Sequence, residues 1–105
     1  MVILDKTNFD SEVNNSNYAI IDFFAEWCGP CKMQGPVLEQ LSTKYPSIKW
    51  CKIDIDDNSS LAAKFDIRSI PTVVFLKDGK EQFRYVGYRP IADVEGYVNK
   101  LLASK

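Results

Sequence analysis

The alternation of apolar and polar residues predicts a strand, helix, strand unit in the first half of the chain. Residues 18–24 (Tyr-Ala-Ile-Ile-Asp-Phe-Phe) are almost continuously apolar, which is typical of a central strand covered on both faces. Apolar residues then recur at helical spacing over residues 30–45, in a helix that Pro36 should kink because it removes a backbone hydrogen bond. Residues 48–55 predict a second strand, so the two strands should be parallel with a right-handed crossover.

The remaining elements are shorter and complete a mixed sheet. The Asp78-Gly79 pair is a strong hairpin signal, so the flanking strands at residues 72–76 and 81–86 should be antiparallel. We also predict a strand at residues 2–4, a helix at 8–13 with Thr7 as its N-cap, a helix at 61–65 capped by residues 56–59, and a last amphipathic helix that begins at Pro90. The pattern predicts an α/β fold, a central mixed five-stranded sheet with four helices packed on both faces.

Composition and charge narrow the classes of function. With 105 residues, 46% of them hydrophobic, the chain can bury one core, and we expect a single domain over residues 1–105. The formal net charge of the chain is −1, so it lacks the excess of positive charge typical of proteins that bind nucleic acids or anionic membranes. The N-terminus reaches Asp5 after a short apolar run, and no run approaches the ~18 apolar residues of a membrane span. We therefore expect a cytoplasmic protein that binds proteins or small molecules. We also expect it to be a monomer.

The three cysteines are an odd number and do not match a framework of structural disulfides, and in a reducing compartment a Cys-x-x-Cys pair is more often catalytic or metal-binding. Cys28 and Cys31 lie at the predicted start of a helix, where unpaired backbone N–H groups and the positive end of the helix dipole favour a thiolate. Cys28 is therefore the expected nucleophile. Because residues three apart share a helical face, the two sulfurs can form a disulfide after a small local adjustment.

A zinc pair or an inert structural disulfide would also explain Cys28 and Cys31. Zinc prefers four nitrogen or sulfur ligands, however, and the chain offers no histidine and one further cysteine, Cys51, so we expect no metal. We interpret Cys51 as a small core residue of a strand, with a regulatory thiol as the alternative. In the redox interpretation, Cys28 attacks a target disulfide, and Cys31 then attacks the Cys28 sulfur and releases the reduced target.

Asp22 places a carboxylate within an otherwise apolar predicted strand. It could lie in water at the end of the strand, because charged groups are rarely buried without a partner. If it is buried, desolvation raises its pKa and makes it a candidate base near neutral pH. Since the chain has no histidine, Asp22 is the best candidate to take the proton from Cys31 as that thiol attacks.

The residues around the two cysteines resemble those of the thioredoxin family. The resemblance rests on residues 25–33 (Ala-Glu-Trp-Cys-Gly-Pro-Cys-Lys-Met) and on the later Ile70-Pro71, and it covers essentially the whole chain. It implies the thioredoxin fold and a protein-disulfide reductase that carries electrons in cell redox homeostasis. It also implies no bound cofactor, recycling by a flavin-containing thioredoxin reductase fed by NADPH, and clients such as ribonucleotide reductase, peroxiredoxins and methionine sulfoxide reductases.

The resemblance also implies a substrate groove beside the cysteines. It assigns Trp27 to the rim of this groove, although Trp27 could be only a packed aromatic residue. It makes Pro71 cis and facing the cysteines, whereas an ordinary X-Pro bond is cis in only ~5–6% of cases. The backbone of Ile70 should pair with an extended target segment, as in strand addition. Gly87 and Tyr88 match the last loop of the groove, where the absence of a side chain at Gly87 lets a substrate approach.

Around the reacting sulfurs, the resemblance places Asp22 beneath Cys31, reached through water, with Lys52 beside it to modulate its charge. Lys52 could instead only extend outward into solvent. Oxidising relatives of the disulfide isomerase kind tend to carry a histidine between the cysteines, which stabilises the thiolate. Gly29 and Pro30 supply no such charge, so we expect a reductant rather than an oxidase or isomerase; Pro30 should also belong to the apolar groove surface.

Two other classes of protein stay open from the sequence: a redox-inert docking subunit that uses the same groove, and a metal storage protein.

Two positions depart from the family pattern. Ser69 stands where members often have glycine, and Phe24 stands where bacterial members often have tryptophan. These departures bear on the source and on partner preference rather than on the chemistry.

Overall fold

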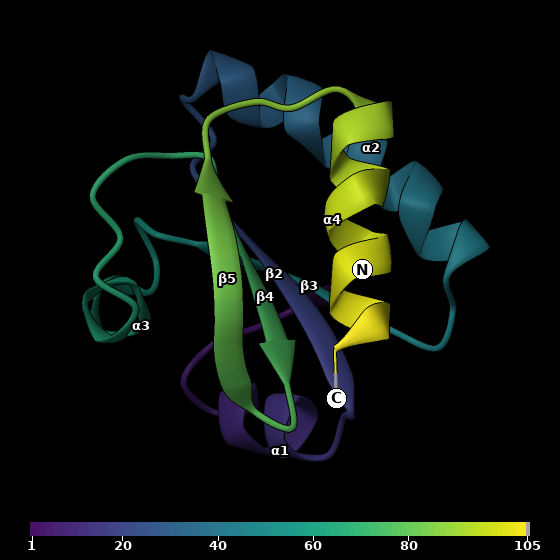
Figure 1. The fold of residues 1–105 in the computed structure, drawn as a ribbon. Helices are drawn as coiled ribbons and strands as arrows, with labels where there is room; N and C mark the ends of the chain where they lie inside the picture. The colour runs from purple at the N-terminus through teal and green to yellow at the C-terminus, as the bar shows by residue number, and fades with distance from the viewer. Residues whose placement is uncertain (105) are drawn as a thin grey trace.

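The structure is a computed structural model that describes residues 1–104. The elements follow one another in the predicted order, and Figure 1 shows a sheet with helices on both sides of it. The strands are β1 (Val2–Ile3), β2 (Tyr18–Phe24), β3 (Lys49–Asp54), β4 (Thr72–Lys77) and β5 (Lys80–Val86), and the helices are α1 (Phe9–Asn14), α2 (Gly29–Lys44), α3 (Ser59–Lys64) and α4 (Ile91–Ala103).

The five strands form one mixed sheet in the order β1-β3-β2-β4-β5. β1 and β2 run parallel to β3, whereas β4 is antiparallel to both β2 and β5, which confirms the predicted parallel unit and the predicted hairpin. β2 lies at the centre, which explains its continuous apolar run. The hairpin turns at Asp78 and Gly79, whose φ angles of 52° and 79° are typical of a tight two-residue loop.

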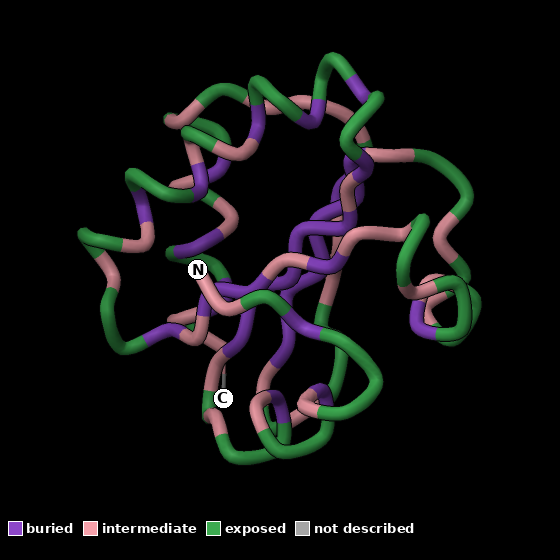
Figure 2. Tube along the Cα trace, turned by 180° about the vertical axis from the view of Figure 1, so that it is seen from behind, coloured by how far each residue is buried: buried purple, intermediate pink, exposed green. Residues whose placement is uncertain are grey.

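Helices pack on the two faces of the sheet in pairs, and the buried residues lie along the strands between them (Figures 1 and 2). One face is covered by Phe9 and Val13 of α1 and Leu61 of α3. The other is covered by Leu38 and Leu41 of α2 and by Val94, Val98 and Leu101 of α4. The sheet therefore separates two hydrophobic clusters, and helix α2 carries the cysteine pair on the second side.

Side chains of β2 alternate between the two clusters. Ile21 belongs to the α1 and α3 side, whereas Ile20 belongs to the α2 and α4 side. By the same alternation Asp22 faces α2 and α4. In the sheet register Asp22 lies opposite Lys52 of β3 and opposite Val73 of β4. The fold thus places the one carboxylate of β2 on the side of the sheet that carries the cysteines.

One of the two predicted helix caps is wrong. The N-cap of α1 is Asn8, not Thr7, and its side chain makes no capping bond. Asp5 organises this turn instead, because its carboxylate accepts from the backbone N–H groups of Thr7 and Asn8 at 2.8 and 3.2 Å. The N-cap of α3 is Asn58, within the predicted segment at residues 56–59, although its side chain makes no capping bond and its amide donates to the Asp54 carbonyl oxygen. In both turns a polar side chain bonds to a nearby residue outside the helix instead of capping the helix.

Candidate functional site

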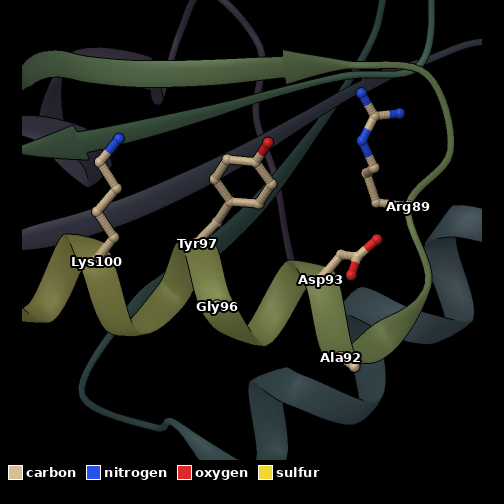
Figure 3. Close-up of a pocket in the computed structure, with 6 residues that line it drawn as sticks. All are labelled: Arg89, Ala92, Asp93, Gly96, Tyr97 and Lys100. Carbon is tan, nitrogen blue, oxygen red and sulfur yellow. The ribbon is translucent and has the colours of Figure 1, made fainter.

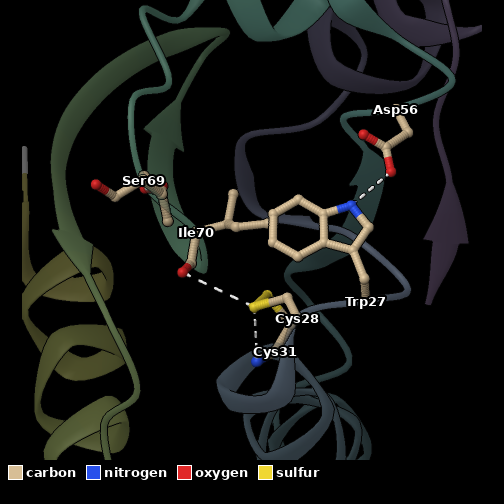
Figure 4. Close-up of a disulfide and its surroundings, with 7 residues drawn as sticks. Trp27, Cys28, Cys31, Asp56, Ser69 and Ile70 are labelled. Carbon is tan, nitrogen blue, oxygen red and sulfur yellow. Dashed lines mark hydrogen bonds between the residues drawn. A yellow bond between two sulfur atoms is a disulfide. The ribbon is translucent and has the colours of Figure 1, made fainter.

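Cys28 and Cys31 form a disulfide across the first turn of α2 (Figure 4). Cys28 is the N-cap residue, and the backbone N–H of Cys31 donates to its sulfur at 3.3 Å. Pro30 lies in the first turn, where its missing N–H would have no helical partner. The two Cα atoms are 5.2 Å apart, an ordinary separation for a disulfide. The helix start therefore brings both sulfurs together and directs a polarised N–H group at Cys28.

The sulfurs lie under a small apolar cluster and face the loop before β4. Each cysteine is 5% exposed, and the partly buried Phe24 and Ile70 pack against the pair. The Cys28 sulfur lies 3.8 Å from the carbonyl oxygen of Ile70 (Figure 4). The Ile70-Pro71 peptide bond is cis, as the resemblance implies. The backbone of Ile70, 42 residues away in the chain, thus lies beside the first sulfur.

Trp27 projects into solvent beside the disulfide rather than into the core, since 69% of it is exposed. Its indole N–H donates to a carboxylate oxygen of Asp56 at 2.8 Å, which fixes the orientation of the ring. Figure 4 shows the indole between Asp56 and Ile70, next to Cys28. The structure places Trp27 at the rim of the site and disagrees with the alternative of a packed core aromatic.

Asp22 is buried, with 3% of its surface exposed, and does not lie in water at the end of the strand. Its Oδ1 atom has no hydrogen-bond partner. Burial raises the pKa of Asp22 from 3.8 to about 7, and the nearby Lys52 charge opposes this rise only in part. A carboxyl group with such a pKa can accept and release a proton near neutral pH.

A cavity of about 210 Å³ connects Asp22 with Cys31. Lys52 lines the same cavity, and the rest of its lining consists of Phe24, Ala25, Glu26, Lys32 and Gly35. A water molecule occupies about 30 Å³ in the liquid, so the cavity has room for water between the carboxyl group and the second cysteine. The Lys52 ammonium group lies 5.7 Å from the centre of the Phe24 ring, another residue that lines this cavity.

The loop after β5 lies next to Pro71 and is hydrogen-bonded to it. The N–H group of Gly87 donates to the carbonyl oxygen of Pro71 at 2.8 Å. Gly87 has a φ angle of +87°, which side-chain-bearing residues rarely adopt, so the sequence needs glycine here. Tyr88 follows it and is half-buried. The structure therefore brings the predicted segments at residues 28–31, 70–71 and 87–88 to one side of the molecule.

Two buried polar residues near the site were not predicted. Gln34 is fully buried on α2, and its amide bonds to the backbone of Arg89. Its place three residues after Cys31, on the buried side of the helix, is a signal that could have identified it. Tyr85 has a buried hydroxyl group without a partner, and burial together with the Asp22 charge raises its pKa. No pattern in the sequence indicates that Tyr85 and Asp22 share one face of the sheet.

The third cysteine, Cys51, is fully buried in β3 and forms no disulfide, as expected for a core residue. Burial raises the pKa of its thiol to about 12, which suppresses the reactive thiolate. Across residues 1–104, no group of three or more His, Cys, Asp or Glu side chains is arranged to hold a metal ion. In the same part of the chain, no helix combines the length and apolarity needed to cross a membrane.

Comparison with known proteins agrees with this geometry. The family model named Thioredoxin matches residues 1–100. The chain is 43% identical to a thioredoxin of Chlamydia pneumoniae, covering 93% of this chain and 95% of the relative. It is 41% identical to a thioredoxin of Staphylococcus saprophyticus, covering 97% and 98% of the two chains.

Solved structures show the same fold. A Plasmodium falciparum thioredoxin superposes with a TM-score of 0.90 at 33% identity, covering 95% of this chain and 98% of that one. A mutant thioredoxin from Halobacterium salinarum superposes with a TM-score of 0.91 at 28% identity, covering 99% and 92%. With its cysteine pair at the start of α2, this chain therefore belongs to the thioredoxin family and is a dithiol-disulfide oxidoreductase.

Proposed function

We propose that Cys28 and Cys31 divide the reduction of a protein disulfide into two exchange steps. The Cys28 thiolate attacks one sulfur of the target disulfide and displaces the other as a thiolate, which gives a mixed disulfide. The Cys31 thiolate then attacks the Cys28 sulfur, which releases the second target thiolate and leaves the Cys28–Cys31 disulfide. Two electrons pass to the target. The Cys31 N–H bond to the Cys28 sulfur supports this order, because the same donor stabilises negative charge on Cys28.

Asp22 acts as the base that takes the proton of Cys31. Support comes from the shared cavity of about 210 Å³ and from the pKa of about 7, which keeps a fraction of the carboxyl group ionised at neutral pH. The transfer runs through water in this cavity. Lys52 modulates the step, because its positive charge favours the ionised form of Asp22.

The target chain binds in a groove whose walls are the three segments that meet at the disulfide. We assign to this groove Trp27, Gly29, Pro30, Ile70, Pro71, Gly87 and Tyr88. An extended segment that pairs with the Ile70 backbone would carry its disulfide next to Cys28, since the Ile70 carbonyl oxygen is 3.8 Å from that sulfur. The exposed indole of Trp27 supplies apolar contact area without selecting one sequence.

Members of this family carry no cofactor of their own and act between a reductase and disulfide-containing clients. For this chain we propose a flavin-containing thioredoxin reductase that uses NADPH as the electron source. We propose clients of the ribonucleotide reductase, peroxiredoxin and methionine sulfoxide reductase types. We further propose a monomer that works in the cytoplasm as a single domain.

The position of Cys28 as the N-cap beside the Ile70 backbone carries this proposal, and trapping tests it. A Cys31→Ser variant should accumulate covalent mixed disulfides with oxidised client proteins, because the second exchange is blocked. Cys28→Ser is the matched control and should trap nothing. A Cys31→Ser variant that forms no adduct, together with no NADPH-coupled reduction by the parent protein, would show that the surface only docks partners.

A further inference from the structure

Gln34 is a fully buried polar side chain that joins α2 to the loop before α4. Its amide nitrogen donates to the carbonyl oxygen of Arg89 at 3.2 Å, and its amide oxygen accepts from the backbone N–H of Arg89 at 2.8 Å. One side chain therefore satisfies both polar groups of one residue that lies 55 positions away. Such paired bonds fix orientation as well as distance.

This link closes a ring of contacts around the proposed groove. Gln34 lies three residues after Cys31 on the same helix, so it is rigidly connected to the cysteine pair. Arg89 directly follows Gly87 and Tyr88, and the Gly87 N–H is bonded to the Pro71 carbonyl oxygen. The loop of residues 87–89 is thus held to the loop of Pro71 at one end and to α2 at the other.

The guanidinium group of Arg89 takes no part in this link. Figure 3 shows the side chain directed toward the strands on the side of α4 that carries Tyr97 and Lys100. It lies 5.7 Å from the centre of the Tyr85 ring, and one of its nitrogens donates to the Tyr88 carbonyl oxygen. The attachment of the loop to α2 therefore depends on the amide of Gln34 and on the Arg89 backbone.

Replacing the amide with an apolar group of similar size would leave the N–H and C=O of Arg89 facing a side chain that cannot bond them. Partly buried backbone groups that lose their partners are unfavourable, so the loop would shift until water reached them. Gly87 and Tyr88 would move with it, because they directly precede Arg89. The helix itself would keep its packing, since Leu38 and Leu41 bury the next turns of α2.

We propose that Gln34 is a positioning residue that holds the 87–89 loop against α2 and thereby sets how fast protein disulfides, but not small disulfides, react with Cys28. The inference rests on the groove proposed above. A folded client must fit between the loop and the Ile70 backbone, whereas a small disulfide needs only the exposed edge of the sulfur. Gln34 touches neither the client nor the reacting atoms and acts through the loop.

The test compares two second-order rate constants for the chemically reduced protein, one with insulin and one with dithiobis(nitrobenzoate). In Gln34→Met, the rate constant with insulin should fall about tenfold, which corresponds to a loss of about 1.4 kcal/mol of transition-state stabilisation. The rate constant with the small disulfide should change by less than about twofold. Gln40→Met is the matched control, since it makes the same substitution at an exposed position of α2 and should change neither rate. Amide hydrogen exchange should show faster exchange at Arg89 in Gln34→Met only.

Several results would overturn the inference: equal loss of both rates, no loss of either rate, or an Arg89 amide that exchanges freely in the parent protein. If Gln34→Met does not fold, Gln34→Asn replaces it, because its neutral amide is one methylene shorter and cannot bond both Arg89 backbone groups from the same position. It should lower the same ratio of rates in the same direction. Trapping by Cys31→Ser with no effect of Gln34 substitution would reject only this inference, whereas failure of trapping would reject the proposed function.

Discussion

Replacing Asp22 with asparagine should raise the free energy of unfolding of the oxidised protein at neutral pH. Between pH 4 and pH 8, the variant should be at least as stable as the parent protein. The side chain is buried and one of its oxygens has no hydrogen-bond partner. Ionisation of such a group creates a charge that neither water nor hydrogen bonds fully stabilise. Asparagine keeps the shape of the side chain and removes the charge. The expected gain therefore depends on how far the carboxyl group is ionised.

The size of the gain follows from the shift in pKa. Burial raises the pKa of Asp22 from 3.8 in the unfolded chain to about 7 in the folded one. The unfolded chain therefore loses this proton first as the pH rises, and the folded state loses stability between about pH 4 and pH 7. A difference of about three pKa units corresponds to about 4 kcal/mol at pH 7 and above, at about 1.4 kcal/mol per unit. Water in the cavity makes this an upper value.

Urea unfolding followed by tryptophan fluorescence, measured from pH 4 to pH 8, provides the assay. The free energy of unfolding of Asp22→Asn minus that of the parent should be near zero at pH 4 and should rise to a few kcal/mol at pH 8. Asp57→Asn is the matched control, because Asp57 is exposed, and its difference should stay flat. A flat difference for Asp22→Asn, or a loss of stability at pH 8, would refute the argument that burial raises this pKa.

Two further predictions concern the same neighbourhood. Lys52→Met should raise the pKa of the Asp22 carboxyl group further, because it removes the positive charge that favours ionisation. A carbon-13 NMR titration of that carboxyl group measures the shift. An unchanged midpoint would contradict this prediction. In the reduced protein, iodoacetamide at pH 7 should modify Cys28 first and leave Cys51 unmodified, because burial raises the pKa of the Cys51 thiol to about 12. Peptide mass spectrometry shows the order of modification. Early labelling of Cys51 would contradict this prediction.

The sequence was informative where a residue's environment is decided by its neighbours in the chain. The run at residues 18–24 predicted β2 with its observed bounds, because a strand buried on both faces must be apolar throughout. Asp78-Gly79 predicted the hairpin because few other pairs adopt positive φ angles there. The Thr7 cap failed because the Thr7 hydroxyl donates to the Asp5 carboxylate, and the helix begins one residue later, after Asn8.

Residues whose roles depend on distant packing could not be predicted. Gln34 finds its partner 55 residues away, so its burial follows from how α2 meets the loop before α4. Tyr85 shares a sheet face with Asp22 only because β4 lies between them in a particular register. The family resemblance supplied the groove residues in advance, whereas these two are features of this chain that only the assembled fold reveals.

The N-cap position of Cys28 has a consequence for how partners tell the two redox forms apart. The Cα atoms of Cys28 and Cys31 are 5.2 Å apart, a separation that successive residues of one helical turn have without any cross-link. Gaining or losing the bond between the sulfurs thus requires no movement of the scaffold. A reductase and a client therefore meet nearly the same molecular shape, and discrimination between the two forms has to come from the charge and hydrogen-bonding capacity of the two sulfur atoms.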